Sequence, residues 1–583
     1  MTRPRFVIVT GPIPAVSRLA EELQANIGTG LALRASPSAI AAFASPGMPI
    51  LDFPGDVGLV IGRLFARDER APLEQVEPAL GRAIAASRGR NLIENYWGDY
   101  IAVGAGGGEA WALRDPSGAI PLYRTRSGDC LILFSDIDDL DRAGLVNPRL
   151  DTAFTTQWLA YPVLRTSRTG IESIKEILPG TRIVFADGAA RDERAWTPRP
   201  FASRRAALAD FEQARSRLRK EVTRIVPALS DGHEPLLLEL SGGLDSALIA
   251  AALRNSGRSF TAVNFATRAP DGDERRYARA IAERVGAPLA VLHEGDTEID
   301  LEVPRAKRVR PAFSPVVQPL HRAFAEHAKA VGAGAFLTGT GGDNVFCYLT
   351  TAAPILDAFW SGHPVRAATT TLRDVAAQCG CTVWTAARFA GRRLARRPRR
   401  SWKRNPDFLL PASVPERPDP HPWLDFGKPM LPGKREHVEA LVRIQHFLDP
   451  ANREADLPFI HPLMAQPIME LCLTIPSWMW VRGGHNRAVA RAAFEDLLPP
   501  AVIDRTTKGR LESMCGSWYL QSRNRLREVL LDGSLRRDRL IDGQALETYL
   551  AREEMPEDPL YFRIFELAAV ELWLESWRGR GHR

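Results

Sequence analysis

One short segment of the sequence has the residue types and spacing of an anion-binding turn. The apolar run 236–240 predicts a buried strand, and the Ala-rich stretch after Asp245 predicts a helix. Two adjacent glycines between them allow a sharp turn with accessible backbone N–H groups, and the helix start adds a positive dipole end. Because the segment has no Lys, it is not a Gly-x-x-x-x-Gly-Lys-Ser/Thr loop. The turn reads Ser241, Gly242, Gly243, Leu244, Asp245, Ser246.

This hexapeptide resembles the pyrophosphate loop (PP-loop), Ser-Gly-Gly-x-Asp-Ser, of enzymes that cleave ATP between the α- and β-phosphates. The resemblance implies that the loop holds pyrophosphate and that Asp245 holds Mg²⁺ against it. It also implies that Leu240 borders the nucleotide and that the backbone near Asn264 meets adenine. The alternative is a tight turn between strand and helix that binds nothing.

A second glycine-rich segment follows the predicted strand Ala335–Thr338. It runs from Thr338 through Gly339, Thr340, Gly341 and Gly342 to Asp343 and Asn344. It resembles Ser/Thr-Gly-x-Gly-x-Asp-Glu of the asparagine synthetase superfamily, with Asn344 in place of Glu. The resemblance implies that Asp343 completes the Mg²⁺ site and that Thr338, Gly339 and Gly342 line the nucleotide. Two carboxylates from two loops suit Mg²⁺, which keeps several waters and takes phosphate oxygens as well.

Two candidates for catalysis lie further along the chain. Glu454 falls in a stretch that resembles Glu-x-Arg-x-Pro-Phe-Leu-Asp of asparagine synthetases, although Asp456 stands where Arg is usual and His461 where Asp is usual. Lys508 falls in a stretch that resembles Arg-x-x-Lys-x-Gly. The resemblance implies that Lys508 stabilises transition-state charge and that Glu454 accepts the proton of an amine. The alternative for Lys508 is an ordinary solvated lysine.

The elements around these motifs alternate between strand and helix. Such alternation predicts a parallel α/β sheet, whose ligands lie beyond the carboxyl ends of its strands. After a linker and lead-in helix (Arg204–Val226), we expect the strands 236–240, Phe260–Phe265, Leu289–Leu292 and Ala335–Thr338, and the helices 245–254, Arg275–Val285 and His321–Val331. Helices are also expected over Arg487–Leu498 and Leu560–Trp577. The resemblance implies a PP-loop synthetase domain of the adenine nucleotide α-hydrolase type over residues 201–583.

Residues 1–200 are predicted to be β-rich. The expected strands are Phe6–Val9, Gly58–Phe65, Tyr100–Val103, Ala110–Leu113 and Cys130–Phe134, with a helix over Pro72–Arg88. The stretches Trp97–Tyr100, Leu113–Tyr123 and Ile177–Thr181 resemble the class II glutamine amidotransferase domain of asparagine synthetases. The resemblance implies an αββα sandwich.

The amidotransferase-like part lacks the residue that its chemistry needs. Active members have Cys directly after the initiator Met, because its thiolate attacks glutamine. This chain has Thr2, followed by Arg3 and Pro4, and its first cysteine is Cys130. We therefore expect no glutaminase activity and a scaffold or docking role for residues 1–200.

Composition narrows the class of protein. The chain has 583 residues, a net charge of +7 and 25% charged residues, which indicates a globular protein of several domains. We find no apolar run of about eighteen residues, no signal peptide and only six scattered cysteines, so we expect a cytoplasmic enzyme without a membrane span.

Residues 349–440 show no regular spacing. Within them, 388–404 hold nine Arg or Lys and no acid, so we expect a basic insert around 349–440 in the synthetase domain. This run is either a solvated face or a surface for an acidic partner or peptide, and nucleic acid is not expected.

Several departures from the asparagine synthetase pattern, among them Thr2 and Asn344, together resemble one branch of the superfamily, the lasso peptide macrolactam synthetases. That branch lacks the N-terminal Cys, often carries Gly-Gly-Asp-Asn and has a long variable insert. The resemblance implies that ATP and Mg²⁺ serve to adenylate an Asp or Glu side chain of a ribosomal precursor peptide, whose own α-amine then closes the ring. It also implies a leader peptidase and a leader-binding module as partners. The alternatives are an ammonia-dependent asparagine synthetase, a β-lactam synthetase-like enzyme, whose general-base Tyr would fall at Thr340, and an inert scaffold.

Overall fold

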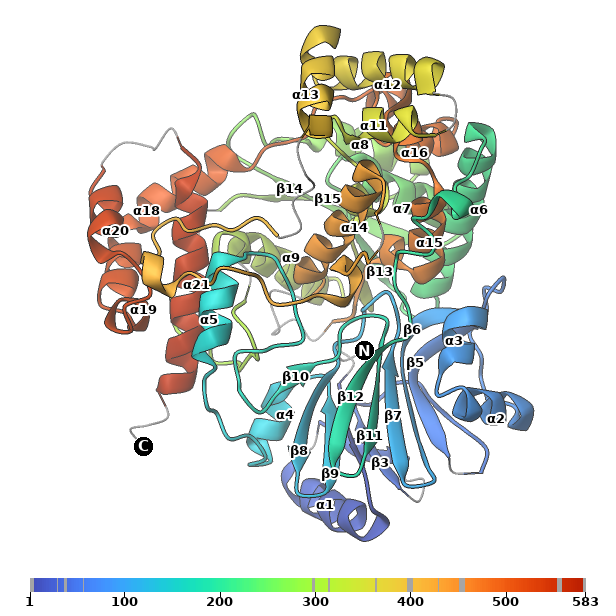
Figure 1. Ribbon diagram of the computed structural model, residues 1–583, viewed down its shortest axis with the longest axis vertical. Helices are drawn as coiled ribbons and strands as arrows, with labels where there is room; N and C mark the ends of the chain where they lie inside the picture. The colour runs from blue at the N-terminus through green and yellow to red at the C-terminus, as the bar shows by residue number, and fades with distance from the viewer. Residues whose placement is uncertain are drawn as a thin grey trace.

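The computed structural model describes residues 5–28, 30–35, 39–55, 57–295, 299–312, 315–361, 364–395, 402–427, 429–449, 457–552 and 558–579. These residues form two antiparallel sheets of six strands each, followed by one parallel sheet of five strands (Figure 1). The antiparallel sheets lie at the lower end of Figure 1 and the parallel sheet lies near its centre.

The antiparallel sheets have the strand orders β10-β8-β9-β1-β3-β2 and β12-β11-β7-β6-β5-β4. The sequence predicted five of these strands. The bounds are β1 (Phe6–Thr10), β2 (Ala32–Ala35), β3 (Ile40–Ala44), β4 (Ile50–Asp52), β5 (Gly58–Ala66), β6 (Tyr96–Gly106), β7 (Glu109–Arg114), β8 (Tyr123–Ser127), β9 (Cys130–Phe134), β10 (Lys175–Glu176), β11 (Thr181–Ala186) and β12 (Ala189–Arg194).

The two sheets pack face to face because their side chains alternate. Ile8 of β1 and Ile61 of β5 belong to the core between the sheets. The alternate residues, Val7 and Val60, face outward, where helices cover them. Helix α1 (Ile13–Asn26) covers the first sheet, and α2 (Pro78–Ala86) and α3 (Arg90–Asn95) cover the second. The αββα sandwich expected from the sequence is therefore present.

The parallel sheet has the order β15-β14-β13-β16-β17. Leu236 and Leu238 pack on the side of α6 (Phe211–Ser230) and α7 (Leu244–Asn255), whereas Leu237 packs with Phe324 of α9 (Gln318–Ala330) on the opposite face. Helices on both faces confirm the expected α/β architecture. The strands and the remaining helix of this unit are β13 (Leu236–Glu239), β14 (Phe260–Ala266), β15 (Leu289–His293), β16 (Ala335–Leu337), β17 (Phe459–Ile460) and α8 (Arg275–Val285).

Although residues 349–440 show no regular spacing in the sequence, much of their described part is helical. It includes α11 (Ala353–Phe359), α12 (Pro364–Gln378), α13 (Val383–Ala395) and the greater part of α14 (Pro432–Ile444). The buried residues of α13 are alanines, Ala386 and Ala390, so its apolar period is weak in the sequence. Figure 1 shows α12 and α13 at the upper edge of the molecule, in yellow.

Helices complete the rest of the chain, and none of those described combines the length and apolar character that a bilayer crossing requires. Their bounds are α4 (Ile137–Arg142), α5 (Thr152–Ala160), α10 (Gly342–Val345), α15 (Gln466–Thr474), α16 (Ala488–Phe494), α17 (Pro500–Ile503), α18 (Glu512–Leu531), α19 (Ser534–Arg537), α20 (Gly543–Leu550) and α21 (Leu560–Arg578), with the 3₁₀ segment η7 at Ser477–Gly484.

A buried ionic cluster joins the antiparallel part to the parallel part. Glu176 is fully buried and pairs with Arg114 at 2.9 Å, Arg165 at 2.6 Å and also Arg310. Arg165 pairs in turn with Asp449 at 3.1 Å. These arginines lower the pKa of the Glu176 carboxyl although burial opposes the shift. We call this group the Glu176 cluster.

Candidate nucleotide site

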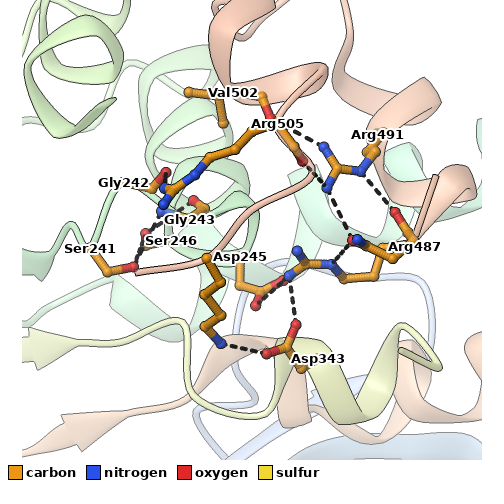
Figure 2. A network of polar contacts seen from close by, with 12 residues as sticks. Ser241, Gly242, Gly243, Asp245, Ser246, Asp343, Arg487, Arg491, Val502 and Arg505 are labelled. Atoms are coloured by element: carbon orange, nitrogen blue, oxygen red, sulfur yellow. Dashed lines mark hydrogen bonds and ion pairs between the residues drawn. The ribbon is translucent and has the colours of Figure 1, made fainter. Parts of the chain in front are cut away.

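The Ser241–Ser246 turn connects β13 to α7 at the carboxyl edge of the parallel sheet. Gly242 has a φ of +79°, and a Cβ there would lie 2.9 Å from Tyr277 Cβ and 3.0 Å from the Glu274 carbonyl oxygen. Only glycine suits this conformation and this space. Ser241 Oγ accepts a hydrogen bond from the Gly243 N–H at 3.3 Å and lies 3.3 Å from Ser246 Oγ (Figure 2). Gly243 is the N-cap of α7 and has no side chain to cap it, which suits an anion at the helix start.

The second glycine-rich loop lies directly against the first. A Cβ on Gly342 would lie 2.3 Å from Asp245 Cγ, and a Cβ on Gly339 would lie 2.8 Å from the Ser246 nitrogen. Glycine at both positions therefore lets the two loops meet, and α10 then begins with Asp343 in its first turn. The structure thus brings Asp245 and Asp343 together from two loops.

A hydrogen-bonded chain fixes the start of the second loop. His461 Nε2 lies 3.2 Å from the Leu448 carbonyl oxygen, which only accepts, so Nε2 carries the proton. His461 Nδ1 then accepts from Thr338 Oγ1 at 3.0 Å, and that oxygen accepts from the Thr340 N–H at 3.0 Å. Burial lowers the pKa of His461 to about 4, in agreement with a neutral ring.

One guanidinium lies between the two carboxylates (Figure 2). Arg487 Nη1 is 3.1 Å from both oxygens of Asp245 and 2.6 Å from Asp343 Oδ1. Burial raises the pKa of Asp245, with Arg487 opposing, whereas Arg487 and Lys508 together lower the pKa of Asp343 against the effect of burial. Arg487 itself has a φ of +55°, which is uncommon for a side chain of this size. The sequence predicted a helix from this residue and gave it no part in the site.

Lys508 contacts the same carboxylate. Its Nζ lies 2.6 Å from Asp343 Oδ2, and its side chain is 65% exposed. The segment that carries it is attached to the first loop, since Arg505 Nη1 donates to the Gly242 carbonyl oxygen at 3.1 Å and Arg505 Nη2 lies 2.6 Å from Glu274 Oε1. The Gly509 N–H donates to the same Glu274 oxygen at 3.0 Å. Glu274 therefore positions the lysine segment.

Asn264 lies on β14, next to Leu240. Its Nδ2 donates to the Leu240 carbonyl oxygen at 2.8 Å, and the Leu240 N–H donates to the Val263 carbonyl oxygen at 2.8 Å. Both residues are buried, so this pair fixes the backbone just before the anion-binding turn. Glu239, one residue earlier, is half-buried, and burial raises its pKa to about 7 while Lys508 opposes the shift.

Some residues of the sequence interpretation lie outside the described residues. They include Glu454, expected to accept the amine proton, its neighbour Asp456, and the N-terminal residues Thr2, Arg3 and Pro4. Their roles stay predictions.

The described carboxylates fit a magnesium ion. Asp245 and Asp343 already share one cationic group, so the space between them is suited to positive charge. Within the described part of the chain no cluster of three or more His, Cys, Asp or Glu could hold a metal. A site of two carboxylates whose remaining ligands are phosphate oxygens and waters is typical of Mg²⁺.

Comparison with known proteins identifies the family. The model of the asparagine synthase family matches residues 217–575, which include the glycine-rich loops, Arg487 and Lys508. The chain belongs to the asparagine synthase family. As a member, it is an ATP-dependent ligase that forms carbon–nitrogen bonds. A search of curated proteins found no match.

Two solved structures of 10% sequence identity align with this asparagine synthase family member at a TM-score of 0.21. One is the allosteric regulatory enzyme of purine biosynthesis, for which 50% of this chain and 80% of the other are covered. The other is the glutamine phosphoribosylpyrophosphate amidotransferase from B. subtilis complexed with ADP and GMP, for which 57% of this chain and 90% of the other are covered. Because these scores are low, the fold assignment depends on the sheets described above.

Proposed function

We propose that the protein is an AMP-forming macrolactam synthetase of the lasso peptide cyclase type. The observation that carries the proposal is the group formed by Asp245, Asp343 and Lys508 beside the PP-loop turn. It supplies metal-binding carboxylates, phosphate-binding N–H groups and a cation in one place, as cleavage of ATP between the α- and β-phosphates requires.

The reaction has two steps. A side-chain carboxylate oxygen of the precursor peptide attacks the α-phosphorus of ATP, the bond to the bridging oxygen breaks, and pyrophosphate leaves. The peptide's α-amine then attacks the acyl carbon, loses a proton to a base, and AMP leaves. Bound Mg²⁺ would neutralise phosphate charge between Asp245 and Asp343. The turn 241–246 would bind the departing pyrophosphate through its N–H groups.

Lys508 can serve both steps. Its ammonium stands at the end of an exposed side chain beside Asp343, in a segment that Glu274 fixes at its base. A mobile point charge held in this way can follow negative charge from the α-phosphate to the acyl oxygen. Glu454 is the base that the family resemblance implies.

Two features favour a peptide over a small amino acid substrate. Thr2 in place of Cys removes the thiol that would release ammonia from glutamine, which favours a substrate that brings its own amine. His461 stands where the resemblance expects an Asp, and both its ring nitrogens are used within the protein. This position therefore offers no charge to a free amino acid.

The test incubates the protein with ATP, Mg²⁺ and a leader-free precursor peptide, then measures loss of one water by mass spectrometry together with AMP. Cyclised peptide and AMP in equal amounts are expected, and Asp343→Asn should yield neither. AMP formation with free aspartate and ammonium, and none with peptide, would overturn the proposal in favour of an asparagine synthetase. Absence of AMP under every condition would favour an inert scaffold.

A further inference from the structure

The outer face of α13 carries large apolar side chains in contact with solvent. Trp384 is 81% exposed, Leu394 56% and Phe389 52%. The opposite face of the helix is packed, because Ala386 and Ala390 join a cluster with Val375 of α12. The exposed side chains are therefore additional to those that attach the helix. Exposed apolar groups gathered in this way mark interaction sites.

The apolar residues form a stripe along the helix. Val383, Trp384, Ala387, Gly391 and Leu394 follow one another at spacings that place them on one side of a helix of 3.6 residues per turn. Small residues lie between the tryptophan and the leucine, so the stripe has large side chains at both ends and little bulk between them. This shape suits the apolar side of a second helix.

Positive charge borders the stripe. Residues 360–404 contain eleven Arg or Lys and a single acid, Asp374. Arg393 pairs with Glu436 at 2.5 Å and so belongs to the packed side. Within the described ranges, no ion pair involves Arg388 or Arg392, which lie next to the stripe and are exposed. An occupant with acidic side chains beside an apolar face would complement this surface.

Helix α12, on which α13 packs, touches two segments that lead to the nucleotide site. Gln378 Nε2 donates to the Leu349 carbonyl oxygen at 2.8 Å, six residues after Asp343. A Cβ on Gly484 would lie 2.8 Å from Ala377 Cβ, and Gly484 precedes Arg487 by three residues. Three extended residues and two helix diameters amount to roughly 30 Å, which about ten extended residues span. One peptide can therefore reach from the outer face of α13 to the site.

We propose that the outer face of α13, defined by Val383, Trp384, Arg388, Arg392 and Leu394, binds an acidic amphipathic segment of the precursor peptide. This inference rests on the proposed function, because it assigns a second contact to the substrate of that reaction. The reach to the site favours a peptide over a lipid surface, which would need no connection to the ligase centre. The apolar stripe beside Arg388 and Arg392 argues against nucleic acid, whose phosphates take cations along their whole path.

The test measures binding by fluorescence anisotropy. The probe is a labelled synthetic peptide of three Glu-Leu-Leu-Glu-Glu-Leu-Ala repeats, and its counterpart has Lys for every Glu. The acidic probe should bind the wild type and the Lys counterpart should not. Trp384→Ala and the double variant Arg388→Glu/Arg392→Glu should each weaken binding about tenfold or more, as loss of a central interface residue does. Arg82→Glu on α2 and Leu33→Ala on β2, both exposed and far from α13, are matched controls and should bind as the wild type does.

A second readout separates this inference from the proposed function. With a peptide that the wild type cyclises, Trp384→Ala should raise KM about tenfold and leave kcat unchanged, since the reacting groups are intact. Unchanged probe affinity in both α13 variants would overturn the docking surface while cyclisation by the wild type still stood. Binding of the wild type to vesicles of phosphatidylserine, lost in the charge-reversal variant, with no binding of the acidic probe would overturn the peptide as occupant. Failure of the wild type to cyclise any peptide would overturn the proposed function. It would also overturn the precursor peptide as the partner that binds the outer face of α13.

Discussion

Arg487 Nη1 lies 2.6 Å from Asp343 Oδ1, between the two carboxylates that we propose as ligands of Mg²⁺. The same nitrogen is 3.1 Å from Asp245, 242 residues earlier in the chain. The guanidinium therefore neutralises two carboxylates that would otherwise repel each other at close range. Its neighbour Arg491 is anchored elsewhere, donating to the Arg505 carbonyl oxygen at 2.8 Å (Figure 2).

Arg487→Gln should destabilise the nucleotide-free protein and increase its response to Mg²⁺. Removing one member of a buried ion pair typically costs about 3 kcal/mol, because the remaining charges stay buried. Mg²⁺ can then neutralise the carboxylates without a competing cation, and ligand binding to the folded state raises stability. Thermal unfolding midpoints with Mg²⁺ and with a chelator measure both effects. Arg487→Lys is the control, and an equal Mg²⁺ response in Arg487→Gln and wild type would contradict the idea.

Asp245→Asn and Asp343→Asn should each abolish formation of AMP and pyrophosphate. The amide keeps the shape of the side chain but removes the charge that a hard cation needs. Circular dichroism should show that the fold is retained, since Arg487 keeps one carboxylate partner in either variant. Near wild-type turnover at saturating Mg²⁺ in either variant would rule out that residue as a metal ligand.

Lys508→Ala should lower turnover by about a hundredfold or more, which is the usual effect of removing one preorganised donor to a transition state. ATP affinity should change little, because the turn 241–246 provides most ground-state phosphate contacts. Lys508→Arg should not restore the full rate, since a planar guanidinium differs in shape from an ammonium. Cyclisation of a leader-free peptide, followed by mass and AMP release, is the measurement. If Lys508→Ala loses less than about tenfold in turnover, the loss is too small for such a donor, and Lys508 is an ordinary solvated lysine.

Glu239→Gln should stabilise the protein at alkaline pH more than at acidic pH. The folded-state pKa of Glu239 is raised to about 7 by burial, above its ordinary 4.5. The folded state therefore holds a proton that the unfolded state releases between these values, so this residue lowers the free energy of unfolding as pH rises through the window. Gln mimics the protonated form at every pH. Melting of the nucleotide-free protein at pH 5 and pH 8 is the measurement, with Glu22→Gln on the exposed face of α1 as control. If the difference in melting temperature between Glu239→Gln and wild type is the same at pH 5 and pH 8, the raised pKa of Glu239 is refuted.

The sequence predicted the elements that have strong local signals. Helix α8 has the predicted bounds, because its polar outer face and Ala278, Ile281 and Ala282 give a clear helical period. The short edge strand β2 was not predicted, since its residues are exposed or only partly buried and carry no alternation. Helix α12 was not predicted, because its buried residues Thr371, Val375 and Ala376 give only a weak apolar period.

The site was predictable where its residues stand next to glycines in recognisable loops. Asp245, Asp343 and Lys508 each stand within two residues of a glycine in such a loop, and the structure brings the three side chains together. Arg487 does not. Its contacts with Asp245 and Asp343 cross 242 and 144 positions of sequence, and such pairings depend on tertiary packing that no local pattern encodes. Two arginines four residues apart, at the start of the otherwise apolar helix α16, were the available signal.

The Glu176 cluster limits where the chain can be cut into fragments that fold independently. A fragment that began at residue 201 would keep Arg310 and Asp449 but lose Glu176 and Arg165, the partners that neutralise them. Charges buried for an intramolecular contact would then face water beside apolar surface, and such a fragment should aggregate during expression. We therefore expect the amidotransferase-like half to act as a folding partner for the ligase half through these ion pairs, whether or not it carries out chemistry of its own.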